Sequence, residues 1–148
     1  MSIFSILIHL HSVLRWLVLL FIVIAIVNAS VKLNRKSPVK LKDCIFNRLT
    51  LIFMHLQLVL GLVLYFISPK VIFNAASMKD SLLRFFLVEH ISLMIIAVVL
   101  VTIGYVKSDR ATDEFKKYKL VVIYFSIALL LILAAIPWPF RGLGAGWI

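Results

Sequence analysis

Four apolar stretches, separated by short segments rich in charged residues, dominate the pattern of the chain. Each contains at most one charged side chain, and they cover residues 1–31, 49–69, 85–106 and 120–140. A helix needs about 20 mostly apolar residues to cross the hydrocarbon core of a bilayer. The pattern therefore predicts four membrane-spanning helices, at about residues 3–31, 39–67, 78–106 and 115–136.

Capping residues and prolines refine the ends of these helices. Ser37 followed by Pro38 is typical of a helix start, because proline suits the first helical position. Ser77 and Asp80 resemble a capping box that would start the third helix at residue 78. Connections this short favour neighbours that run antiparallel. We therefore expect an all-α, up-down-up-down four-helix bundle in one domain, 1–148, with a re-entrant or interfacial loop over 137–148.

The composition agrees with a membrane protein and excludes other classes. The residues AVILMFWYC make up 64% of the chain and charged residues only 15%, and a chain of this length cannot bury so much apolar surface in its own core. A soluble enzyme and a disordered chain are excluded. The single cysteine, Cys44, excludes an internal disulfide and a cysteine metal cluster. The surroundings of the helices are therefore predicted to be lipid.

The basic residues indicate how the bundle is oriented. The formal net charge is +10, which in a soluble protein would suggest nucleic acid, but in a membrane protein basic residues mark cytoplasmic loops. Most of them lie around the first and third connections: Lys32, Arg35, Lys36, Lys40, Lys42 and Arg48, then Lys107, Arg110, Lys116, Lys117 and Lys119. We therefore expect both termini outside and no nucleic-acid partner.

Ionisable side chains at membrane depth are the candidates for function, because burying them in a bilayer is costly. They are His9, His11, Arg15, His55, Glu89 and His90. Residues 55 and 90 lie equally far from the middle of the connection between their helices, so they should share one depth. His11 should lie within about one turn of that depth, counted at 1.5 Å per residue. Three histidines from three helices are thus expected close together.

Two imidazoles on facing helices, with an apolar slot between them, suit a b-type haem. Zinc fits less well, because its sites generally add carboxylate or thiolate ligands. We expect His90 and either His55 or His11 as the axial pair, and the third histidine beside the site or on a second haem. His9 and His11 lie about 200° apart around the helix and cannot both face one site. His9, nearest the outer surface, is the weakest candidate.

Polar groups near the histidines add secondary expectations. Arg15 lies four residues after His11 on the same helix face and could hold a haem propionate or pair with Glu89. The helix pattern turns Gln57 away from the face that carries His55. In the Pro- and Gly-rich C-terminal segment, Arg141 could fold back over the mouth of the bundle to cap propionates or guide a quinol.

Several motifs together resemble a family of small bacterial four-helix membrane proteins labelled cytochrome B or cytochrome b-like. The motifs are His11-Ser-Val-Leu-Arg-Trp16, His55-Leu-Gln57 with Gly61, Phe85-Phe-Leu-Val-Glu-His90 with Met94, and Ile136-Pro-Trp-Pro-Phe-Arg141. The resemblance covers nearly the whole chain. It implies a multi-pass protein of the bacterial inner membrane, with His11, Arg15, His55, Glu89, His90 and Arg141 at motif positions.

Two functions remain open from the sequence. The first is an electron-transfer protein with one haem b, a second not being excluded, that exchanges electrons with a quinone or a partner subunit. In this function an ionisable group such as Glu89 would take the proton of the quinol. The second is a haem-free subunit or scaffold of a larger membrane complex, in which the same polar residues form a buried network that fixes the helices.

Overall fold

The computed structural model describes residues 2–143 and 146–147, and these residues form helices and no strand. The long helices are α1 (Ile3–Arg35), α2 (Leu41–Ile67), α4 (His90–Arg110) and α5 (Glu114–Ala135). The short ones are the 3₁₀-helix η1 (Ala75–Met78), α3 (Ser81–Arg84), the π-helix η2 (Phe85–Glu89) and the 3₁₀-helix η3 (Pro139–Arg141). α3, η2 and α4 are continuous over Ser81–Arg110. The described residues thus contain four helices long and apolar enough to cross a membrane, as predicted.

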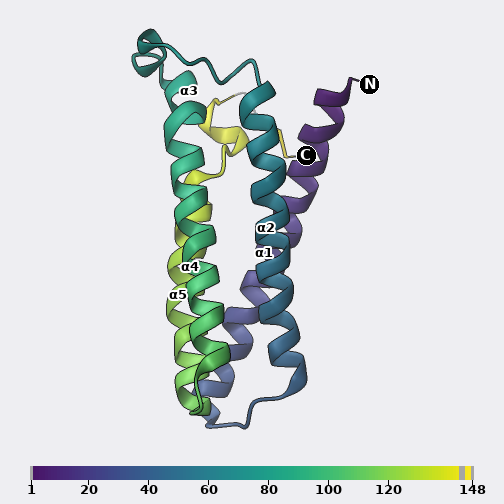
Figure 1. Cartoon of the computed structure of the whole chain (residues 1–148), viewed down its shortest axis with the longest axis vertical. Helices are drawn as coiled ribbons and strands as arrows, with labels where there is room; N and C mark the ends of the chain where they lie inside the picture. Colours follow the sequence, from purple (N-terminus) through teal and green to yellow (C-terminus); the bar gives the residue numbers. More distant parts are fainter. Residues whose placement is uncertain (1, 144–145, 148) are drawn as a thin grey trace.

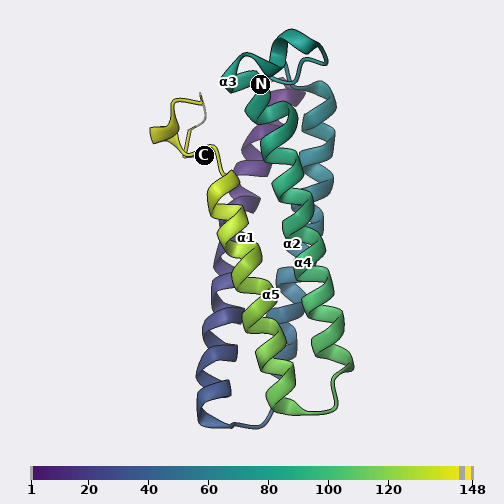
Figure 2. The ribbon, with the colours of Figure 1, turned by 90° about the vertical axis from the view of Figure 1, so that its left-hand side faces the viewer.

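The four long helices form an elongated bundle (Figure 1). α1 packs against α2 and α5, and α4 packs against α5 and α2. The start of the chain and the connection 68–80 lie at one end, which we call the upper end. The connections 36–40 and 111–113 lie at the other, the lower end, and the view turned by 90° shows the same division (Figure 2).

Two helices begin later than predicted, and in both cases an aspartate explains the difference. α2 begins at Leu41 rather than 39, because the Asp43 carboxylate accepts a hydrogen bond from the Lys40 amide at 2.8 Å. The third spanning helix begins at Ser81 rather than 78. Its cap is Asp80, which accepts from the amides of residues 82 and 83, both at 2.9 Å. Such carboxylates satisfy amides that have no partner inside the helix.

The core of the bundle follows spacings of three and four residues along each helix. On α1 it comprises Val18, Ile22, Ala25 and Ala29, and on α5 it comprises Val121, Phe125, Ala128 and Ile132. This spacing keeps one stripe of each helix against its neighbours. The alanines are fully or almost fully buried, and small residues allow helices to approach closely inside a membrane.

A buried carboxylate ties three helices together at the lower end. Asp43 at the start of α2 forms an ion pair with Lys32 of α1 and accepts hydrogen bonds from Asn28 and Tyr118, both at 2.9 Å. Only 5% of the Asp43 side chain and 16% of the Lys32 side chain are exposed. Because Asn28 and Lys32 lie on α1 and Tyr118 lies on α5, this cluster fixes α1, α2 and α5 relative to one another.

Gly104 marks the closest approach of α4 and α5, and its substitution is expected to be costly. A Cβ atom at this position would lie 2.5 Å from the Cβ of Tyr124, so the backbones must separate to admit a methyl group. We expect Gly104→Ala to lower the free energy of unfolding by about 1–3 kcal/mol, as overpacking does. Unfolding in denaturing detergent measures this change. The neighbouring Ile103→Ala faces outward and serves as control, and an equal loss there would contradict the packing argument.

Candidate functional site

A cavity of about 250 Å³ opens inside the upper half of the bundle and is lined by residues of all four long helices. Most of its lining is apolar, including Val18, Met54, Val98 and Ile132. Polar side chains gather around it: His11, Ser12, Arg15, Gln57, Tyr65, Ser68, Lys70 and His90. An apolar cavity with a few convergent polar groups is typical of a ligand-binding site.

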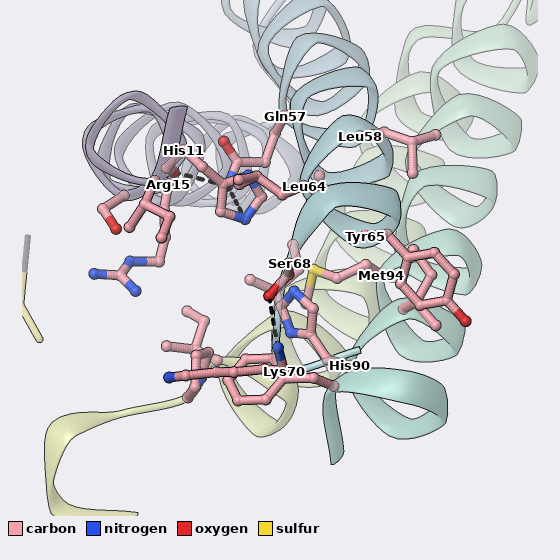
Figure 3. Close-up of a pocket in the computed structure, with 18 of the residues that line it drawn as sticks. His11, Arg15, Gln57, Leu58, Leu64, Tyr65, Ser68, Lys70, His90 and Met94 are labelled. Atoms are coloured by element: carbon pink, nitrogen blue, oxygen red, sulfur yellow. Dashed lines mark hydrogen bonds between the residues drawn. The ribbon is translucent and has the colours of Figure 1, made fainter. Parts of the chain in front are cut away.

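The rings of His11 and His90 approach one another across this cavity from α1 and α4. Their centroids lie 6.4 Å apart and their planes are inclined by 68°, and Figure 3 shows both rings beside the same space. Two imidazoles that bind one metal ion from opposite sides, through nitrogens about 2 Å away, have centroids roughly 6 Å apart. The separation of the two rings therefore matches a pair that holds one ion between them.

The ring of His90 is held in one orientation by α5. Its Nδ1 lies 2.8 Å from the carbonyl oxygen of Ala135. Because a carbonyl only accepts, Nδ1 must carry the proton, and in the neutral ring Nε2 is left with its lone pair. Histidines that bind metals almost always donate their other ring N–H in this manner. His90 is thus prepared to bind a metal through Nε2.

A π-helix immediately before His90 determines the direction in which this residue points. In η2 the turn holds one residue more than in an α-helix, so His90 is rotated relative to the helix that precedes it. The hydroxyl of Tyr65 on α2 donates to the carbonyl oxygen of Leu87 within η2 at 2.8 Å. π-Helical turns occur frequently at functional sites, and here the turn leads directly into a cavity-lining histidine.

Removal of the Tyr65 hydroxyl is therefore expected to weaken this turn. Tyr65→Phe leaves the Leu87 carbonyl without that donor, and we expect a loss of about 1 kcal/mol in the free energy of unfolding. Unfolding in denaturing detergent measures the loss. Tyr124→Phe is the matched control, since its hydroxyl bonds to Lys107 on the exposed surface. Equal stabilities of the two variants would show that the hydroxyl does not support the π-helix.

His11 is positioned by two residues of α2. The amide nitrogen of Gln57 donates to the backbone carbonyl oxygen of His11 at 3.0 Å and lies 3.2 Å from its Nε2. Gly61 lies one turn further on, where an added Cβ would be 3.2 Å from Cε1 of the ring. The absence of a side chain at Gly61 thus provides room for the imidazole. Gln57 does point away from the face of His55, as predicted, but its own face is the one that meets His11.

Three buried side-chain atoms have no hydrogen-bond partner among the described residues, and all belong to residues that line this cavity. They are Nδ1 of His11, Nε of Arg15 and Oε1 of Gln57. Buried polar groups in native proteins are nearly always paired with protein, water or ligand. Their common location indicates that water or a bound polar group in the cavity pairs with them.

His55 does not join His11 and His90, contrary to the expectation that three histidines lie close together. It is exposed on the surface of α2, and its Nδ1 bonds to the carbonyl oxygen of Leu51 at 2.8 Å. The reason is angular: Gln57 faces His11, and a residue two positions away points about 200° from it. His9 is likewise exposed, on the side of α1 opposite His11.

Glu89 and Arg141 also lie elsewhere than expected. Glu89 pairs with Nε of Arg84 at 2.9 Å on the partly exposed surface, and it is not among the residues that line the cavity. Arg141 does not fold back over the mouth of the bundle; its guanidinium donates to the carbonyl oxygens of Ala134 and Ile136. Neither side chain lines the cavity, where contact with a quinol or propionates was expected.

The cationic groups near the mouth of the cavity contact the C-terminal segment. Arg15 and Trp16 both donate to the carbonyl oxygen of Trp147, at 2.7 and 3.1 Å, and Nζ of Lys70 donates to that of Leu143. Burial lowers the pKa of the Lys70 ammonium below its usual range. The expected loop over 137–148 includes residues 144, 145 and 148, which lie outside the described part of the chain.

Comparison with known proteins finds no matching family model, no matching curated protein and no matching solved structure. Within the described residues, no three histidine, cysteine, aspartate or glutamate side chains lie together as a metal-binding group. A zinc site commonly uses three or four such ligands. The arrangement at this cavity is instead a pair of imidazoles that face each other across an apolar space.

Proposed function

We propose that this protein is a b-type cytochrome of the bacterial inner membrane, in which His11 and His90 hold the iron of one haem. The observation that carries the proposal is the approach of these two rings to 6.4 Å inside an apolar cavity. The resemblance of the sequence to cytochrome b-like proteins points the same way. A haem with two imidazole ligands transfers single electrons.

The residues around the cavity fit such a group. His90 has its Nδ1 proton bonded to a carbonyl, and Gly61 gives room to the ring of His11. Among the described residues Nε of Arg15 has no hydrogen-bond partner, and it could receive a propionate. Haem is larger than the cavity, so lining side chains must move on binding. Met54 and Met94 line the space, and methionine adapts readily because it is unbranched and flexible.

The chain's own residues have distinct tasks in this proposal. The bonds from His90 to Ala135 and from Gln57 to His11 hold the two rings across the cavity. The apolar lining excludes water and so affects the reduction potential. Arg15 and Lys70 provide positive charge at the mouth. A membrane quinone or a partner subunit supplies or accepts the electron.

The proposed topology follows from the basic residues. The lower end contains both strongly basic connections, so it faces the cytoplasm. The bundle then runs up-down-up-down with both termini outside, and the cavity lies near the outer surface.

A visible spectrum tests the proposed function. Protein expressed in haem-replete cells and purified in detergent should show, in its reduced-minus-oxidised spectrum, the sharp α band of a b-type haem at about one haem per chain. A flat spectrum would refute the proposal. It would favour instead a haem-free membrane subunit, whose specific support is that Gln57 and Ala135 already hydrogen-bond to the two histidines.

A further inference from the structure

The C-terminal end of α5 lies against His90. The last carbonyl oxygens of α5 accept hydrogen bonds from particular side chains. The last carbonyls of any helix have no partner inside that helix. Here the carbonyl of Leu133 accepts from the indole of Trp138 at 2.9 Å, and that of Ala134 accepts from Arg141 at 2.8 Å. The carbonyl of Ala135 accepts from His90.

Two prolines explain why these carbonyls are available. If α5 continued, the amides of residues 137 and 139 would bond to the carbonyls of Leu133 and Ala135, four residues earlier. Both residues are proline, which has no N–H and cannot make these bonds. The segment Pro137-Trp-Pro thus ends the helix and leaves the Ala135 carbonyl for His90.

Arg141 holds this end of the helix from the other side. Its Nη1 donates to the carbonyl oxygens of Ala134 and Ile136, on either side of Ala135, at 2.8 and 3.2 Å. Its guanidinium also lies over the ring of Phe85, 4.9 Å from the centroid. The Phe85 ring is buried and lies 5.9 Å from the ring of His90. Arg141 therefore contacts both the helix end and the aromatic ring that flank His90.

We propose that Arg141 is a positioning residue for His90. By bonding to the carbonyls on either side, it orients the Ala135 carbonyl toward Nδ1 and so keeps the proton there and Nε2 available to a metal. The inference rests on the proposed function only in taking haem iron as the metal that Nε2 binds. The orientation of the His90 ring and the position of its proton are properties of the protein without haem.

The test measures the His90 ring directly. Nitrogen NMR of the full chain, labelled with ¹⁵N-histidine and assigned by comparison with His90→Ala, is recorded with and without haem. In the wild type we expect one tautomer with the proton on Nδ1. Arg141→Gln should give a mixture of both tautomers and about tenfold weaker haem binding, since loss of such outer partners weakens metal binding by about 10–100-fold.

Two further variants complete the test. Arg141→Lys keeps the charge but not the planar fork, so it should give an intermediate result, and it serves if the glutamine variant does not fold. Lys79→Gln removes an exposed charge from the same end and should leave His90 unchanged. A wild-type tautomer retained in both Arg141 variants would overturn the inference. A wild type that binds no haem would refute the proposed function, while the tautomers would still decide the role of Arg141.

Discussion

Replacing His90 with alanine is expected to abolish haem binding. In the proposed site, His90 is the ligand whose ring is held by the Ala135 carbonyl with Nε2 left for the iron, and nothing at position 90 of the variant can replace the imidazole. The α band should be absent from the reduced-minus-oxidised spectrum of the purified variant. Size-exclusion chromatography in detergent should show that the variant is folded and monodisperse.

The other histidines provide the controls for this experiment. His55 and His9 are exposed and lie outside the cavity, so His55→Ala and His9→Ala should keep a full α band. His11→Ala should lose the band or show a weaker and shifted one, because a single imidazole remains. A variant series in which His55→Ala lost the band and His90→Ala kept it would show that a different pair binds haem.

Replacing Asp43 with alanine is expected to be the most destabilising single change at the lower end. It leaves the ammonium of Lys32 almost buried without its counter-charge, together with the unpaired groups of Asn28 and Tyr118. Removing one partner of a buried ion pair costs about 3–5 kcal/mol. Equilibrium unfolding in denaturing detergent should therefore show a loss of this size in the free energy of unfolding.

The second ion pair of the described residues is the matched control. Arg84 and Glu89 have side chains that are 43% and 42% exposed, and exposed pairs contribute about 0–1 kcal/mol. Glu89→Gln should therefore change stability by no more than about 1 kcal/mol. Similar losses in Asp43→Ala and Glu89→Gln would show that burial does not determine the effect. Because the Asp43 cluster lies at the end opposite the cavity, Asp43→Ala should still bind haem when it is folded.

The four spanning helices could be predicted because long apolar runs report directly on the bilayer. The approach of His11 and His90 could be anticipated in part, since counting residues from each connection estimates depth. Depth does not give the direction in which a side chain points. This is why the expectation that His55 lies close to His11 and His90 is wrong. Gln57 and Gly61, four residues apart on one helix face, contained the missing information: a small residue and an amide that together accommodate His11.

Other features of the site depend on contacts that no local pattern records. The π-helix shifts the helix faces after residue 85 by inserting one residue in a turn, and nothing in the sequence Phe85–Glu89 distinguishes it from an α-helix. The prolines at 137 and 139 predict the end of α5. That the Ala135 carbonyl, left without a partner inside the helix, meets His90 depends on how α4 and α5 pack at the upper end.

Electron paramagnetic resonance of the oxidised protein tests most directly whether two imidazoles share one iron. The wild type should give the low-spin ferric signal of a haem with two strong axial ligands, and His11→Ala should give a high-spin signal or none. A high-spin signal from the wild type, or an unchanged low-spin signal from His11→Ala, would contradict the assignment of His11 and His90 as the axial pair.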